Sequence, residues 1–123
     1  MKTLKTLIVD DVKLIRIELR MLLSNYKEID VIGEAGNVKE ALKFIYDEKP
    51  DVLFLDIYLP DSSGFELLDK LEMDLKVIFI SSYFNKYSSE ILKYNPVDIL
   101  SKPINKTKLS DAIKKLTEYI HNE

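Results

Sequence analysis

Three carboxylates, a hydroxyl and an amine each occur at the end of a short apolar run in this sequence. Asp10 and Asp11 follow the first run, Asp56 the third, Ser81 the fourth and Lys102 the fifth. Three carboxylates held a few ångströms apart repel one another, so either their pKa values rise or a cation joins them. Mg2+ prefers oxygen ligands, commonly one or two carboxylates together with waters and a phosphate oxygen. A fold that gathers these five residues would therefore form a site for Mg2+ and a phosphoryl group.

Such a site predicts phosphoryl transfer to a carboxylate. Beside a divalent ion, Asp56 can attack phosphorus as an oxygen nucleophile, while the ion and Lys102 neutralise the equatorial oxygens of the transferred group. Taken singly, an Asp is also a common helix N-cap, Ser81 a common turn residue and a lysine a common surface residue. Their shared position at strand ends favours the chemical interpretation, with Asp56 as the acceptor.

Five apolar runs recur about every 20 to 25 residues, and each predicts a buried strand because large and β-branched apolar residues follow one another without strict alternation. The runs are Leu7 to Val9, Val31 to Gly33, Val52 to Leu55, Val77 to Ile80 and Val97 to Leu100. Strands of this kind are typical of a parallel sheet that is covered on both faces.

Segments with helical periodicity lie between the runs. Apolar side chains recur at helical spacing from Ile15 to Tyr26, from Val38 to Tyr46 and from Leu109 to Ile120, and Phe65 to Leu71 and Tyr87 to Tyr94 predict two shorter helices. Alternating strands and helices predict a doubly wound α/β fold, flavodoxin-like, with five parallel strands in the order 2-1-3-4-5 and helices on both faces. In such a sheet the carboxyl ends of the strands form the site, which brings the five polar residues together.

Composition limits the other possibilities. A chain of 123 residues is long enough for one domain, expected over residues 1–123, and too short for two. There is no cysteine, and the one histidine, His121, is expected to be a solvated residue near a helix end, which excludes zinc sites and Ser-His triads. The net charge of -3 gives no basic field for nucleic acid. The start of the chain is neither a signal peptide nor a membrane span, so we expect a cytoplasmic domain that does not contact a membrane.

Four motifs in order resemble the receiver domains of bacterial two-component response regulators, and the resemblance covers essentially the whole chain. The motifs are Ile8-Val9-Asp10-Asp11, Asp51-Val52-Leu53-Phe54-Leu55-Asp56-Ile57-Tyr58-Leu59-Pro60 with Gly64, Phe79-Ile80-Ser81-Ser82, and Leu100-Ser101-Lys102-Pro103. An acid pair alone would be weak evidence, whereas four motifs at successive strand ends are strong evidence.

The resemblance implies a role for each site residue. Asp56 would accept the phosphoryl group from a sensor histidine kinase or a phosphotransfer protein. Mg2+ would be held by Asp10, Asp11, Asp56 and the backbone carbonyl of Tyr58, while the side chains of Ser81 and Lys102 would contact phosphoryl oxygens. The Lys102-Pro103 peptide bond is also expected to be cis.

This sequence departs from the family pattern at the position of Ile99, where many relatives carry Tyr or Phe. That ring turns inward when the hydroxyl at the Ser81 position moves toward phosphate, and an aliphatic side chain cannot make the same movement. Two phenol rings, Tyr58 and Tyr83, stand at the positions that govern access of water to the acyl phosphate. We expect them to exclude water and to slow hydrolysis, because an unperturbed tyrosine pKa of about 10 offers no strong base.

The output of the domain is expected on the face formed by the fourth helix, the fifth strand and the fifth helix, where a partner or a second copy of the chain would bind. Tyr87, Tyr94 and Lys114 are candidates for that face. The stretches Ser82 to Tyr87 and Asn95 to Leu100 resemble receivers that precede LytTR-type DNA-binding domains. An attached effector and a separate partner both stay open as outputs.

Two other functions fit the same architecture. A phosphatase of the haloacid dehalogenase type also uses Mg2+ and an aspartyl phosphate, but it needs a second Asp two positions after the nucleophile, and here those positions hold Tyr58 and Val12. A flavodoxin-like FMN carrier needs a first loop that cradles phosphate, which Asp10 and Asp11 would repel. Rapid turnover of a phosphate ester would favour the phosphatase, and yellow purified protein would favour the carrier.

Overall fold

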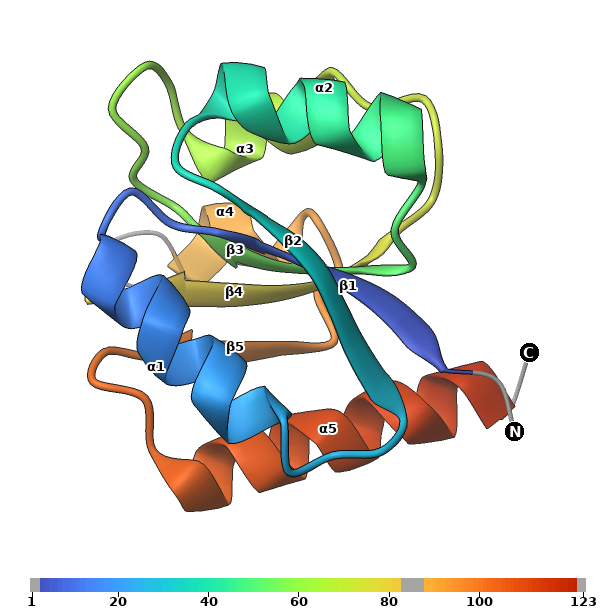
Figure 1. Cartoon of the computed structure of the whole chain (residues 1–123). Helices are drawn as coiled ribbons and strands as arrows, with labels where there is room; N and C mark the ends of the chain where they lie inside the picture. The colour runs from blue at the N-terminus through green and yellow to red at the C-terminus, as the bar shows by residue number, and fades with distance from the viewer. Residues whose placement is uncertain (1–2, 83–87, 122–123) are drawn as a thin grey trace.

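A computed structural model of the chain describes residues 3–82 and 88–121, in which strands and helices alternate from one end to the other (Figure 1). The strands are β1 (Leu4–Val9), β2 (Ile29–Ala35), β3 (Val52–Asp56), β4 (Lys76–Ser81) and β5 (Asp98–Ser101). The helices are α1 (Lys13–Leu23), α2 (Val38–Glu48), α3 (Gly64–Asp69), α4 (Ser88–Leu92) and α5 (Lys106–His121).

All five strands are parallel, in the order β2-β1-β3-β4-β5, as predicted. The order reverses between β1 and β3, which lie side by side with Val9 opposite Leu55. The polypeptide therefore leaves these two neighbouring strands toward opposite faces of the sheet, and a ligand can approach the carboxyl ends between the two connections.

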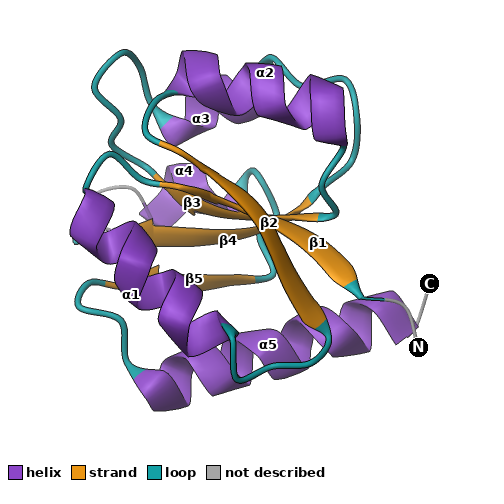
Figure 2. Cartoon of the chain, in the orientation of Figure 1, coloured by secondary structure: helices purple, strands orange, loops and turns teal. Residues whose placement is uncertain are grey.

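Helices cover both faces of the sheet, α1 and α5 on one and α2, α3 and α4 on the other (Figure 2). Alternate residues of each strand point to opposite faces. Val52 and Phe54 of β3 pack with α1 and α5, whereas Leu53 and Leu55 pack with α2 and α3. This explains the continuous apolar runs, since every position of a central strand is buried.

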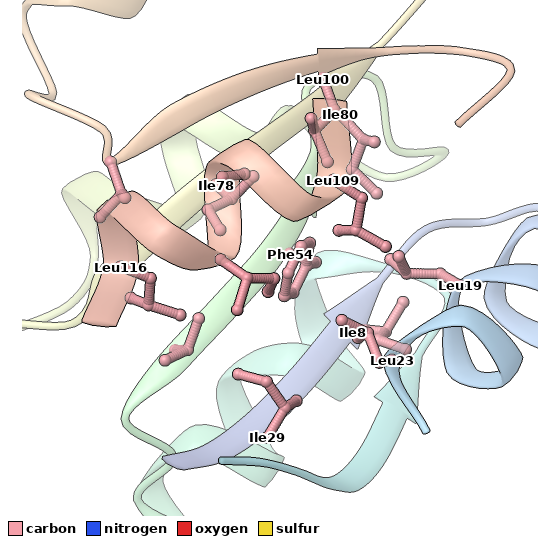
Figure 3. Close-up of a cluster of buried hydrophobic side chains, with 14 of the residues drawn as sticks. Ile8, Leu19, Leu23, Ile29, Phe54, Ile78, Ile80, Leu100, Leu109 and Leu116 are labelled. Atoms are coloured by element: carbon pink, nitrogen blue, oxygen red, sulfur yellow. The ribbon is translucent and has the colours of Figure 1, made fainter. Parts of the chain in front are cut away.

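The core beside α1 and α5 is built around Phe54, which is fully buried (Figure 3). Its neighbours come from β1, β4, β5 and both helices, and include Ile8, Leu19, Ile78, Leu100, Leu109 and Leu116. The core on the other face includes an aromatic group in which Tyr94 stacks on Phe65 at 5.1 Å between ring centroids. The two cores together hold the strand ends in a fixed arrangement.

The predicted elements are all present, and their bounds differ by a few residues. β1 starts at Leu4 and not at Leu7, and β2 runs to Ala35. Asp56 and Ser81 are the last residues of β3 and β4, and do not follow these strands as predicted. The predicted Tyr87 to Tyr94 helix is shorter, with α4 ending at Leu92. Tyr87 itself and Tyr83 lie outside the described residues.

Candidate functional site

The carboxyl ends of β1 and β3 bring three carboxylates together. One oxygen atom from each of Asp10, Asp11 and Asp56 lies within 4.8 Å of the others. Asp10 and Asp56 are buried, whereas Asp11 is exposed at the mouth of the site. Within residues 3–82 and 88–121, this is the one group of three or more acidic or histidine side chains arranged in this way. The prediction that Asp10, Asp11 and Asp56 lie together at the strand ends is confirmed.

Asp56 is held by contacts from two other segments. Its Oδ2 accepts a hydrogen bond of 2.9 Å from Nζ of Lys102, and its Oδ1 accepts one of 3.2 Å from the backbone N–H of Tyr58. Burial raises the pKa of Asp56 to about 6, Asp10 adds to the rise, and the contacts with Lys102 and Tyr58 oppose it. The carboxylate is therefore oriented, and a cation placed beside it would favour its charged form.

Lys102 reaches this carboxylate from the end of β5. Its Nζ also lies 2.7 Å from Oδ2 of Asp10, and its backbone N–H donates to the carbonyl of Ser81 at 3.2 Å. Burial acts to lower the pKa of Lys102, but its contacts with Asp10 and Asp56 outweigh burial and raise it. The Lys102-Pro103 peptide bond is cis, as expected. The amine is thus a fixed positive charge inside the acidic cluster.

The donor atoms of this cluster fit a hard divalent cation. Oδ2 of Asp10 is buried, and Nζ of Lys102 lies 2.7 Å from it. Three carboxylates this close together repel one another more than a single amine can offset, and a bound divalent cation would relieve that repulsion. All the available donors are oxygens, which suits Mg2+.

A cavity of about 240 Å3 opens over the cluster. It is lined by Asp11, Asp56, Tyr58, Leu59, Pro60, Ser82 and Lys102. Tyr58, which is 40% exposed, forms one side of the opening. The cavity therefore lies where a group bound to Asp56 would be placed.

Ser81 does not line this cavity, whereas Ser82 does. Ser81 is fully buried and pairs with Ser101 in the sheet. The sequence analysis assigned Ser81 to a phosphoryl oxygen, which stays a prediction, and gave no role to Ser82. The alternation of side chains across a strand, continued by one residue past β4, is the signal that could have identified Ser82 as the exposed hydroxyl.

Sequence reasoning also missed two residues that hold the site from outside. Arg16 donates from Nη1 to the carbonyl of Asp10 at 2.6 Å and from Nε to Oε1 of Glu34 at 3.0 Å. Asp61 accepts backbone hydrogen bonds from the start of α2. The contacts of Arg16 with Glu34 and of Asp61 with α2 join segments 18 or more residues apart, so no local pattern predicts them.

A larger cavity, of about 580 Å3, lies at the opposite edge of the sheet. Its lining comes from the beginnings of the strands and from the end of α5, including Leu4, Asp51, Lys76, Val97 and Tyr119. None of the predicted site residues lines it. The chemistry predicted from the sequence therefore belongs to the smaller cavity.

Comparison with known proteins agrees with the geometry of the site. Residues 6–114 match the sequence model of the response regulator receiver domain. The chain is 37% identical over 115 residues to the sensory transduction protein LytT of Bacillus anthracis, covering 91% of this chain and 46% of that protein. It is 39% identical over 115 residues to a response regulatory protein of Vibrio cholerae, covering 92% of this chain and 48% of that protein.

A solved structure shows the same likeness in three dimensions. The signal receiver domain of a modulated diguanylate cyclase from Desulfovibrio desulfuricans superposes with a TM-score of 0.79 at 31% identity, covering 95% of this chain and 99% of that one. The present chain spans about half the length of the curated relatives it matches. In the described part of the chain, no helix has both the length and the apolar character needed to cross a bilayer.

Proposed function

The chain belongs to the response regulator receiver domain family of two-component signalling, and we propose that it accepts a phosphoryl group on Asp56 from a sensor histidine kinase or a phosphotransfer protein. The observation that carries this proposal is the cluster of Asp10, Asp11 and Asp56 within 4.8 Å, with Lys102 in contact with two of them. A receiver is a signalling module and not a classical enzyme, and we propose that this one assists its own phosphorylation.

In the transfer step, an oxygen of Asp56 forms a bond to phosphorus while the bond from phosphorus to the donor's nitrogen or oxygen breaks. Asp10, Asp11, Asp56 and the carbonyl of Tyr58 would hold Mg2+, which would neutralise charge on the phosphoryl oxygens. Lys102 would pair with another of these oxygens through its amine. The hydrogen bond from Tyr58 N–H to Oδ1 keeps the Asp56 carboxylate in one orientation during the attack.

The phosphodonor is proposed to dock beside α1. Four apolar side chains there are unusually exposed: Val12 at 45%, Leu14 at 71%, Ile17 at 42% and Met21 at 67%. Leu14, Ile17 and Met21 recur at helical spacing, and Val12 directly follows Asp11. An apolar stripe that starts at the acidic site suits a helical partner that presents its phosphorylated residue to Asp56.

The change of state is proposed to start at Ser81. Ser81 is fully buried, and its carbonyl accepts the backbone N–H of Lys102. A phosphoryl group that draws both residues inward would shift the end of β4 and the start of α4. Ile99 is partly buried against the core that contains Phe79 and Tyr94, so this movement would proceed without an aromatic ring at that position.

The output is proposed to lie on the face formed by α4, β5 and α5, where Leu92 is 70% exposed and Lys114 is also exposed. A partner, a second copy of the chain, or an attached DNA-binding domain of the LytTR type would respond there. The likeness to LytT proteins that are about twice as long as this chain supports the attached domain. We propose that residues 1–123 form the receiver alone, that it acts in the cytoplasm, and that it does not itself bind nucleic acid.

The haloacid dehalogenase-type phosphatase gains no support from the site. The position two residues after Asp56 holds Tyr58 and not the second Asp that such an enzyme needs as its general acid. The proposal is tested by incubating the protein with acetyl phosphate, with Mg2+ or with a chelator, and measuring its intact mass. We expect one phosphoryl group per chain only with Mg2+. Rapid repeated turnover of acetyl phosphate, without a phosphorylated species, would favour the phosphatase.

A further inference from the structure

The loop that joins β3 to α3, residues 57–63, folds back on itself beside the acidic cluster. Tyr58 and Ser63 form an antiparallel bridge, and Leu59 N–H donates to the carbonyl of Ser62 at 3.2 Å. Gly64 N–H closes the base of the loop by donating to the carbonyl of Ile57 at 2.8 Å. These bonds make the loop a compact unit, so a shift of its tip would be transmitted to Tyr58.

The tip of this loop is attached to a helix far away in sequence. Asp61 accepts the backbone N–H of Val38 at 2.9 Å with Oδ1 and that of Lys39 at 3.2 Å with Oδ2. In Figure 1 the loop rises beside the start of α2, where these two residues lie. The first N–H groups of a helix have no partner within the helix and favour negative charge nearby. These hydrogen bonds hold the pKa of Asp61 below its usual value.

A second residue caps the same helix end without touching the loop contacts. Asn37, the N-cap of α2, accepts the backbone N–H of Glu40 at 2.8 Å. The start of α2 therefore has two side-chain caps, a local one that accepts one N–H group and one from the loop that accepts two. Removing either should lower the stability of α2. Only the loss of Asp61 would also release the loop.

The loop carries two of the groups that act on the site. Tyr58 N–H orients Oδ1 of Asp56, and Tyr58 supplies the carbonyl proposed as a metal ligand. The base of the loop tolerates little change, since a Cβ at Gly64 would lie 2.6 Å from the carbonyl oxygen of Asp56. Because the base packs this closely against Asp56, a movement of the loop that follows the release of its tip would also disturb the backbone that faces Asp56.

We propose that Asp61 is a positioning residue for the metal site, which fixes residues 57–63 against α2 so that the backbone of Tyr58 faces Asp56. This inference rests on the proposed function, because it assumes that Mg2+ binds at the acidic cluster. Asp61, an exposed carboxylate outside the acidic cluster, would thereby increase the affinity of the cluster for Mg2+.

The test compares Asp61→Ala with Asn37→Ala in the full chain, by calorimetric titration with Mg2+ alone and by hydrogen exchange at the Tyr58 amide. Both variants should lose thermal stability. Asp61→Ala should lower Mg2+ affinity roughly 10-fold, the usual effect of losing a partner outside the ligand shell, and should speed exchange at Tyr58. Asn37→Ala should change neither. Asp61→Asn, whose amide oxygen can still accept one bond, should recover part of the affinity.

The outcomes separate the two proposals. Wild-type affinity in Asp61→Ala, or an equal loss in Asn37→Ala, would overturn the positioning role while leaving the metal site in place. A wild-type chain that does not bind Mg2+ would overturn the proposed function and this inference together. If Asp61→Ala does not fold, the comparison of Asp61→Asn with the wild type decides, and unchanged affinity and exchange there would refute the inference.

Discussion

Nζ of Lys102 lies 2.7 Å from Oδ2 of Asp10 and 2.9 Å from Oδ2 of Asp56, so one amine bridges two buried carboxylates. In the metal-free protein Lys102 supplies, among the described residues, the one positive charge in contact with this pair. This places the amine in the same region that a divalent cation would occupy. The single charge of Lys102 does not balance the three carboxylates of Asp10, Asp11 and Asp56, so the metal-free site keeps an excess of negative charge that suits a divalent cation.

Lys102→Ala should destabilise the metal-free protein by about 3 kcal/mol, because it leaves two buried carboxylates without their cation. Mg2+ should bind this variant at least as tightly as the wild type, and stabilise it more, while the response to phosphorylation weakens. Denaturant unfolding with and without Mg2+ measures this. The control is Lys115→Ala, which removes a surface ion pair with Asp98 and should cost less than about 1 kcal/mol. Weaker Mg2+ binding in Lys102→Ala would show that the amine only supports the fold.

The stability of the metal-free protein should depend on pH through Asp56. The pKa of Asp56 is about 6 in the folded protein and near 3.8 in the unfolded chain. The contribution of Asp56 to the free energy of unfolding is therefore fully present below pH 3.8 and is lost as pH rises through 6. At pH 7 the free energy of unfolding of Asp56→Asn should exceed that of the wild type by on the order of 1 to 3 kcal/mol. Thermal unfolding from pH 4 to pH 8 without Mg2+ measures the difference. A constant difference across that range would contradict the shifted pKa.

Arg16 should matter more to the site than its neighbour Arg20, although both pair with Glu34. Arg16 also donates to the carbonyl of Asp10, and its side chain is 18% exposed against 45% for Arg20. We expect Arg16→Ala to cost about 1 to 3 kcal/mol, and Arg20→Ala less than about 1 kcal/mol. Denaturant unfolding and Mg2+ titration of the two variants measure the difference. If Arg16→Ala and Arg20→Ala lose equal stability and equal Mg2+ affinity, the contact of Arg16 with Asp10 is unimportant.

The ion pairs of Glu34 with Arg16 and Arg20 predict that the protein loses stability in acid. Burial acts to raise the pKa of Glu34, but its contacts with Arg20 and Arg16 outweigh burial and lower it. A lowered pKa gives stability that is present above about pH 4.5 and is lost as pH falls further, so the difference between wild type and Arg16→Ala should shrink in acid.

Phosphate on Asp56 should be long-lived because Tyr58 forms one side of the cavity above it. Tyr83, the second predicted shield, lies outside the described residues. The double variant Tyr58→Asn, Tyr83→Glu should lose its phosphate roughly tenfold faster, which corresponds to about 1.4 kcal/mol of barrier. Decay of the phosphorylated protein, followed by intact mass, gives the rate. A double variant that decays no faster would exclude shielding by these rings.

The fold was predictable because it depends on repeated local patterns. Residues such as Val52 to Leu55 are buried on both faces, and a run of that kind has few interpretations other than a central parallel strand. The order of the strands followed from the alternation with helices. The convergence of Asp10, Asp11 and Asp56 followed in turn from the rule that such strands end at one edge.

The parts that could not be predicted depend on contacts between distant segments. Nothing near Asp61 indicates that it caps α2, because its partners Val38 and Lys39 are more than twenty residues away. The exposure of Ser82 and the burial of Ser81 depend on where β4 ends, which the apolar run defines only to within a residue. Strand ends are the least certain part of a sequence-based prediction, and here they decide which of the two serines is exposed at the cavity.

The most direct test of the account is to find which residue carries the phosphate. The protein is phosphorylated with acetyl phosphate and Mg2+, the acyl phosphate is reduced with borohydride to homoserine, and the modified position is found by peptide mass spectrometry. The account predicts homoserine at position 56 alone, and none in Asp56→Asn. Modification at Asp10 or Asp11, or equal labelling of Asp56→Asn, would contradict it.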